Sequence, residues 1–287
     1  MANAQFIYRD EIARAVMLES SAAVDDLGNA LSARNLQLAG LGDVARFTGK
    51  TLEWVRAQWT QKAAIDTVAV LGHTASQDGE ATLRLYDDLT ATTLLTSVDG
   101  LIWPQVYGIG EAPMNEQTIA GIPILSDLDD YPPFRLYRLD QTYSAALLEL
   151  ELRDPASARS YLQLARLFAG VRWEPAYNFS IGVEHGVGDD DRVTTLGRGA
   201  LLTERGNSWR TLRLTFADLS KSEADTFLAD FMRRVRTSLD FVVVAEPDGG
   251  LGEWRSCIYG RLIGRPRRRQ VDARNWGVTL DIEEIVQ

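Results

Sequence analysis

Short runs of alternating or β-branched residues recur along the whole chain and predict a mainly β protein. Residues 146–152 (ALLELEL) and 211–216 (TLRLTF) alternate with the period of two that gives a strand one buried face. Most runs are bounded by Gly, Pro, Asp, Asn or Ser, which is the turn chemistry that strands need. The remaining predicted strands cover residues 15–18, 54–59, 65–71, 81–86, 161–168, 179–184, 241–245, 257–263 and 276–285.

One segment has helical periodicity instead. Ser220 is followed three residues later by Glu223, the spacing of a capping box. Acidic residues lie in the first turns and arginines near the end, as the helix dipole favours. The apolar residues that share one face at helical spacing are Ala224, Phe227, Leu228, Phe231 and Val235. We therefore predict one amphipathic helix, which leads directly into a buried strand.

Residues 89–141 are less regular and are rich in Gly, Pro and aromatic residues. The pair Pro132-Pro133 cannot lie in a central strand. This segment is predicted to be a long irregular insertion with exposed aromatics. Trp103, with Tyr107 and Tyr137, is its best candidate recognition surface, because aromatic residues dominate interface hot spots and also stack on sugar rings.

Composition changes in the polar, Gly-containing segment 185–199, which predicts a domain boundary. We expect a β-sandwich domain over residues 1–185, with the insertion at 89–141 inside it. Residues 186–287 are expected to form a smaller α+β domain that contains the amphipathic helix.

The overall balance is that of an ordinary soluble protein, with 287 residues, 45% hydrophobic and 24% charged. No apolar run is long enough to cross a bilayer, and the N-terminus has no secretory signal, so synthesis in a cytoplasm is expected. The net charge of −10 argues against nucleic acid as a partner. Cys257 is the only cysteine, so neither an intrachain disulfide nor a thiolate zinc site is expected.

Three features invite a chemical interpretation, and each also has a structural one. His73, in IDTVAVLGHTAS, could be a catalytic base, a metal ligand or a residue that contacts a sugar. The residues around it in the sequence favour a structural role in shaping the loop. Asp189–Asp191 could bind calcium, but the absence of an EF-hand pattern favours a solvated linker. The basic run 261–270 (RLIGRPRRRQ) could bind nucleic acid, but that would need a wider basic footprint on a less acidic chain. A hairpin turn or protected strand edge is favoured, and a contact to an acidic neighbouring subunit is the third interpretation.

No common catalytic or nucleotide-binding motif is present in the sequence. We therefore expect no catalytic, cofactor-binding or metal-binding residues and no enzyme activity. A glycan-degrading enzyme that uses a pair of acids stays open as the least favoured alternative, since such pairs leave no reliable local motif.

The order of several segments resembles known families. Segments 15–47, 53–59, 65–76 and 81–88 resemble the galactose-binding-like, discoidin-type jelly roll, with Asn35-Leu36 after the opening strand and Gly72-His73 at a strand end. In that family the residue after the histidine is usually Asn, whereas here it is Thr74.

The continuation is similar to structural proteins of phage tails. The matching elements are Arg153-Asp154-Pro155, then 165–170 (ARLFAG) with Ala165 in place of the usual Gly, then Trp173, Pro175 and Asn178. The C-terminal segments 211–232, 241–248, 259–266 and 276–285 are similar to the closing α+β part of the same proteins.

This resemblance implies a virion protein of the tail tip or baseplate of a siphophage, of the minor tail or distal tail protein kind. Its implied partners are other tail proteins and copies of itself in a ring or trimer, with no membrane insertion. The alternative is a carbohydrate-binding module that contributes to host attachment, with a host glycan as its ligand. Fold similarity by itself carries no sugar-contacting residues over to this chain.

Overall fold

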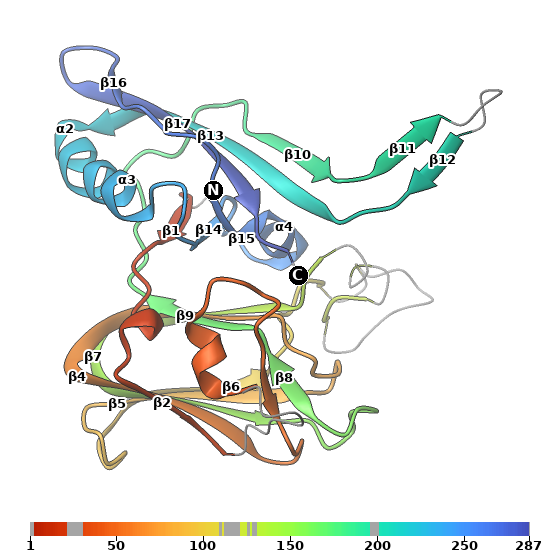
Figure 1. The fold of residues 1–287 in the computed structure, drawn as a ribbon. Coiled ribbons are helices and arrows are strands. Elements are labelled where there is room, and N and C mark those ends of the chain that lie inside the picture. The colour runs from red at the N-terminus through yellow and green to blue at the C-terminus, as the bar shows by residue number, and fades with distance from the viewer. Residues whose placement is uncertain are drawn as a thin grey trace.

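The computed structural model describes residues 3–21, 31–108, 111, 121–124, 127, 131–195 and 201–286. These residues form two β-rich units, one above the other (Figure 1). The chain begins in the upper unit, passes down through the lower one and returns to finish in the upper unit. All of the strand pairs in the described residues are antiparallel.

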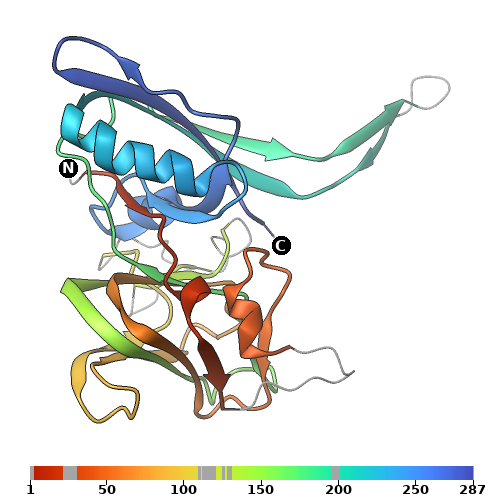
Figure 2. The same ribbon diagram turned by 60° about the vertical axis from the view of Figure 1, so that its left-hand side comes forward.

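The lower unit is a β-sandwich built on a six-stranded sheet in the order β2-β4-β7-β5-β6, with β9 also paired to β4. Two short 3-10 helices, η1 (Ile12–Arg14) and η2 (Ala33–Gln37), pack at its side (Figure 2). The strands are β2 (Met17–Ser20), β3 (Ala45–Phe47), β4 (Glu53–Leu71), β5 (Glu80–Tyr86), β6 (Leu94–Leu101), β7 (Phe134–Arg153), β8 (Leu162–Leu164) and β9 (Arg166–Gly170).

Two long strands, β4 and β7, contribute to both layers of the sandwich. Their pairing shifts register between Gln58 and Ala63 and again between Ile65 and Thr67. Before the first shift β4 pairs with β2, and after the second it pairs with β9. Because such irregularities bend a strand, one strand can line two faces of the core. The predicted strands 54–59 and 65–71 are therefore two halves of one element.

The upper unit is a seven-stranded sheet in the order β1-β14-β15-β17-β13-β10, with β16 paired to β17. Its short helix α4 (Gly250–Ser256) precedes β15 and lies toward the sandwich. The strands are β1 (Gln5–Ile7), β10 (Glu184–Asp189), β13 (Ser208–Ser220), β14 (Phe241–Val244), β15 (Cys257–Leu262), β16 (Arg269–Gln270) and β17 (Asn275–Glu284).

The predicted amphipathic helix is confirmed. It runs through α2 (Lys221–Glu223), a π-helical turn η4 (Ala224–Leu228) and α3 (Ala229–Val235), with the Ser220–Glu223 capping box formed. Its apolar face covers one side of the upper sheet (Figure 2). The other side of that sheet carries polar pairs such as Thr215 with Thr279.

The predicted fold class is confirmed: a mainly β, antiparallel sandwich is followed by a smaller α+β part with one clear helix. Three local differences stand out. The predicted boundary after residue 185 falls within β10, and β1 pairs with β14, so the upper sheet draws on both sides of that boundary. Residues 179–183 form no strand. Within the predicted insertion 89–141, β6 and the start of β7 are regular strands.

Candidate functional site

A two-stranded arm projects from the edge of the upper sheet (Figure 1). Strands β10 and β13 pair from Glu184 with Arg213 to Asp189 with Ser208, and the arm continues as β11 (Arg192–Thr195) paired with β12 (Leu201–Glu204). Beyond Asp189, β11 and β12 pair only with each other among the strands that the structure describes. An isolated two-stranded hairpin is only marginally stable in water, so contact with another surface would stabilise this arm.

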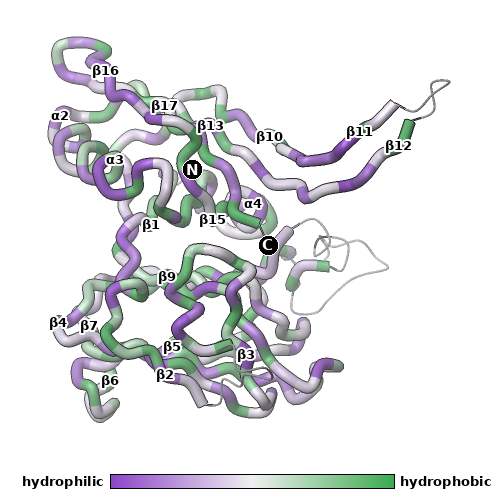
Figure 3. The backbone as a smooth tube through the Cα atoms, viewed as in Figure 1, coloured by the Kyte–Doolittle hydropathy of each residue, from purple (hydrophilic) through white to green (hydrophobic). Residues whose placement is uncertain are grey.

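The arm also exposes apolar side chains. Val187, Val193, Leu201 and Leu202 have exposed fractions of 74%, 61%, 66% and 47%. Figure 3 shows the hydrophobic colour of β12 at the far part of an otherwise polar arm. Unpaired backbone edges next to exposed apolar residues are a template for pairing with a further chain.

The acidic triplet lies where β10 passes into the arm, which corrects its interpretation as a linker. Asp189 accepts a hydrogen bond from the Asp191 backbone at 3.2 Å, and Asp191 accepts one from the Gly206 backbone at 2.8 Å. All three carboxylates are exposed, and none forms an ion pair within the described part of the chain. Among the described residues, no three His, Cys, Asp or Glu side chains are arranged so that they could hold a metal ion, and this includes the triplet.

The basic run forms the connection between β15 and β16, which both pair with β17. Residues 263–267 and Arg269 border a groove of about 610 Å³ that is also lined by Thr215 and Thr279. Arg265, Arg267 and Arg269 all lie along this groove and are exposed. The groove is a feature of the upper sheet's polar side, away from the helix.

A buried ionic network joins the two units. Arg166 of β9 is 1% exposed and donates to Asp10 at 2.7 Å and to Asp240 at 2.8 Å. It also contacts the Tyr259 hydroxyl at 3.2 Å and donates to the Leu36 carbonyl at 2.8 Å. Burial raises the pKa of Asp10 to about 6, although Arg166 acts in the opposite direction. The network therefore fixes the sandwich, the N-terminal segment and the upper sheet to one another.

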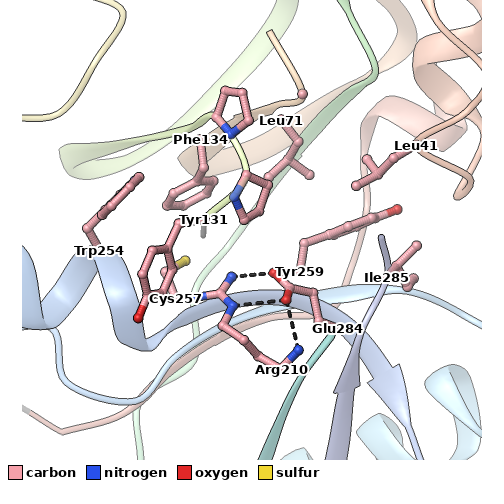
Figure 4. A pocket seen from close by; sticks show the side chains of 13 residues that line it. Leu41, Leu71, Tyr131, Phe134, Arg210, Trp254, Cys257, Tyr259, Glu284 and Ile285 are labelled. Carbon is pink, nitrogen blue, oxygen red and sulfur yellow. Dashed lines mark hydrogen bonds and ion pairs between the residues drawn. The ribbon is translucent and has the colours of Figure 1, made fainter. Parts of the chain in front are cut away.

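A second joint between the units lies beside Tyr259 (Figure 4). Arg210 forms an ion pair with Glu284 and lies over the ring of Tyr131, with 5.2 Å from the guanidinium carbon to the ring centroid. The enclosed space is only about 20 Å³, enough for one water molecule and no larger ligand. Cys257 is buried at this joint, and burial raises the pKa of its thiol.

His73 follows the end of β4, as expected, but it is buried rather than exposed in a loop. Its ring meets Trp103 edge-on with 4.5 Å between centroids, and its side chain is enclosed. Neither ring nitrogen has a hydrogen-bond partner among the residues described. Burial lowers the pKa of His73 to about 3, so the imidazole is neutral near pH 7 and is walled off from any substrate.

The proposed aromatic recognition surface is wrong. Trp103, Tyr107 and Tyr137 are 4%, 9% and 2% exposed. Trp103 donates from its indole nitrogen to the Ser76 carbonyl at 2.9 Å, and Tyr107 donates to Asp127 at 2.6 Å. These aromatics therefore pack and tie down the segment that follows β6.

Sequence reasoning missed both the arm and the Arg166 network. The arm's strands are short and mostly polar, and their weak signal is the β-branched run Val193–Thr195 between turn residues. Arg166 has no local signal, because its two carboxylate partners lie more than 70 residues away in the sequence.

No family model matches this chain, and no curated protein matches it. Several solved structures match over somewhat more than half of the chain. A CBM32 module of a Clostridium perfringens protein, solved with GalNAc-β-1,3-galactose, has 8% identity and a TM-score of 0.39 over 57% of this chain and 100% of its own. A Streptococcus pneumoniae fucose-binding module has 13% identity and a TM-score of 0.37 over 57% and 95%.

The lectin domain of lectinolysin, solved with Lewis b antigen, is a third match, with 12% identity and a TM-score of 0.36 over 57% of this chain and 97% of its own. These three neighbours are described as a CBM32 module, a fucose-binding module and a lectin domain. At such TM-scores they are no argument for what this chain binds. None of the described helices has the length and apolar character needed to cross a membrane.

Proposed function

We propose that this chain is a non-enzymatic structural subunit of a bacteriophage tail tip or baseplate. It is made in the host cytoplasm and incorporated into the virion, where it assembles with copies of itself and with other tail proteins. The proposal combines the sequence resemblance to minor and distal tail proteins with one structural feature, the projecting arm. The non-enzymatic part of the proposal is supported by His73. This histidine was the main catalytic candidate in the sequence, but its side chain is buried and neutral near pH 7.

The arm carries this proposal because it is costly to leave unpartnered. It exposes Val187 on β10 and three further large apolar side chains on β11 and β12, which pair only with each other among the described strands. In an assembly, a neighbouring chain covers these side chains and pairs with a free strand edge. Each apolar side chain that becomes buried contributes about 1.5–3 kcal/mol, which is the driving force for association.

The test is to remove the arm while keeping the sheet. Residues 190–207 are replaced by Asn-Gly, which closes a two-residue hairpin between the directly paired Asp189 and Ser208. We expect the natural chain to form a defined multimer by sedimentation velocity, and the trimmed chain to be a folded monomer.

A matched control shortens a hairpin of the sandwich. Replacing residues 87–93 with Asn-Gly joins the paired residues Tyr86 and Leu94 in the same way. This control should associate as the natural chain does. A natural chain that stays monomeric at high concentration, or a trimmed chain that still associates, contradicts the assembly proposal. Absence of the protein from purified virions contradicts its place in the tail.

Glycan binding by the sandwich is the second candidate, and a surface patch favours it. Arg46 of β3 lies over the ring of Tyr161, which directly precedes β8, at 4.4 Å, and it donates to the side chain of Gln163 in β8 at 3.3 Å. An aromatic face beside guanidinium and amide groups offers stacking and hydrogen bonds to a sugar. Calorimetry with host polysaccharide decides: binding that Tyr161→Ala abolishes supports this function, and no binding by the folded natural chain rejects it.

A further inference from the structure

We propose that the arginine-lined groove beside the β15–β16 connection binds the acidic base of the arm, residues Asp189–Asp191, of a second copy of this chain. This inference deepens the proposed assembly, on which it rests, by naming the two surfaces that meet. The contact is head-to-tail, since the groove and the arm are different patches of the same molecule.

The groove presents positive charge that forms no ion pair with the residues that the structure describes. Arg265, Arg267 and Arg269 are exposed, and no ion pair to any of them occurs among the described residues. The other two arginines of the basic run do form ion pairs: Arg261 with Glu283 at 2.6 Å and Arg268 with Asp225 at 2.8 Å. Three unpaired cations along one groove of a chain with net charge −10 mark a surface for an anionic partner.

The groove also has the shape to hold a chain segment. Its volume of about 610 Å³ is large enough for several side chains, and it is open along one side. Ile263 and Val271 supply apolar walls, while Thr215 and Thr279 supply hydroxyl groups on the floor. Asp281, the acidic residue that borders it, is already paired with Arg213 at 2.5 Å.

The base of the arm is the complementary surface. Asp189, Asp190 and Asp191 are exposed and consecutive, and Glu204 lies on the facing strand. These four carboxylates have no cationic partner in the described ranges, although Arg192 is nearby. The backbone N–H groups of Asp191 and Gly206 donate hydrogen bonds to the Asp189 and Asp191 carboxylates. These bonds fix the junction between β10 and β11, and with it the arrangement of the acids.

Geometry prevents a chain from filling its own groove. In both ribbon views β16 and the arm lie at opposite ends of the upper unit (Figures 1 and 2), and the segment that connects β15 to β16 runs along β17, with which both strands pair. The arm is continuous with the paired strands β10 and β13, whose register keeps it directed away from the groove. A second copy therefore supplies the arm, and repetition of this contact gives a ring when the rotation closes.

A charge-exchange experiment tests the contact. One variant reverses the arm with Asp189→Arg, Asp190→Arg and Asp191→Arg, and another reverses the groove with Arg265→Glu, Arg267→Glu and Arg269→Glu. We expect the self-association constant of each variant alone, measured by sedimentation velocity at low salt, to fall by at least about tenfold. The reason is that like charges then face each other across the contact. Mixing the two should restore association, since the reversed arm of one fits the reversed groove of the other.

The control reverses three exposed arginines elsewhere, with Arg34→Glu, Arg159→Glu and Arg233→Glu. It changes the net charge by the same amount as the groove variant and should associate as the natural chain does. Association of the natural chain should also weaken as the salt concentration rises from about 50 mM to about 500 mM, because salt screens the attraction between exposed charges.

The outcomes separate this inference from the assembly proposal. If the arm-trimmed chain is monomeric but the groove-reversed chain associates normally, the arm docks elsewhere, and this inference is overturned while the proposed function stands. If the natural chain itself is monomeric, both fail. If the two reversed variants do not associate when mixed, and the natural groove instead binds duplex DNA through its arginines, nucleic acid is the occupant and the inference is overturned.

Discussion

At the scale of single residues, His73 shows how far burial changes a side chain's chemistry. Gly72, directly before it, has a φ of +64° and donates its backbone N–H to the Pro133 carbonyl at 2.8 Å. This turn directs His73 inward against Trp103 instead of into solvent. The sequence predicted a structural role for His73, but its enclosure depends on a neighbour 30 positions along the chain.

The enclosure of His73 predicts a pH dependence of stability. Its pKa is about 3 in the folded chain and about 6.5 unfolded, so the unfolded state binds more protons between these values. Stability from this group is therefore present above pH 6.5 and is lost as the pH falls toward 3. At pH 5 the loss relative to pH 7 is about 2 kcal/mol.

Denaturant unfolding of the natural chain and of His73→Leu, at pH 7 and at pH 5, measures this effect. The variant should lose about 2 kcal/mol less than the natural chain on acidification, because it has no buried group to protonate. Comparing the two removes the contribution of the other acids. An identical pH response of both chains contradicts the assignment.

At the scale of elements, local signals were reliable where an element depends on its own residues. The helix is such a case, since the spacing of Ser220 and Glu223 and of the apolar face is visible in the sequence and is formed in the structure. Strand signals were also sound, but the joining of residues 53–71 into one bent strand was not predicted. The exposed Thr60, Gln61 and Lys62 look like a turn. They lie in the register shift between Gln58 and Ala63, and the strand continues through them because β7 pairs with β4 on both sides of that shift.

The capping box gives an element-scale prediction. The Ser220 hydroxyl accepts a hydrogen bond from the Glu223 backbone at 3.2 Å, and the Glu223 carboxylate accepts one from the Ser220 backbone at 2.9 Å. Ser220→Ala removes the first bond and should lower the free energy of unfolding by about 1 kcal/mol. Chemical denaturation measures it, with the exposed Ser222→Ala as control. Equal stabilities of the two variants contradict a role for the cap.

At the scale of the whole molecule, Arg166 is the most deeply buried of the charged residues that join the two units. Its positive charge is buried with two carboxylates, and such a pair is costly to break, because removal of one partner leaves the others charged and unpaired. No pattern along the sequence indicates this, since charged residues are usually exposed.

Arg166→Met should therefore lower the free energy of unfolding by about 3–5 kcal/mol. It should also split thermal unfolding into two transitions, as the sandwich and the upper sheet lose their shared network. Adding Asp10→Asn and Asp240→Asn should recover part of the loss, because the buried charges are then gone. Differential scanning calorimetry reads both effects.

The control for this prediction is Arg213→Met, which removes solvent-exposed ion pairs with Glu184 and Asp281 and should lower stability far less than Arg166→Met does. If Arg166→Met unfolds in one transition at the temperature of the natural chain, the network does not couple the units.

The sequence by itself determined the mainly β class, most strand positions and the capped helix, because periodicity and turn chemistry are local properties of the chain. Only the tertiary structure decided that β1 joins a sheet with β14, that Trp103 and Tyr137 are core residues, and that Asp189–Asp191 begin a projecting arm. Each of these depends on contacts between segments far apart in the sequence, and burial and strand pairing are set by those partners. The tail-tip resemblance remains a prediction, and the arm and the groove are the surfaces on which to test it.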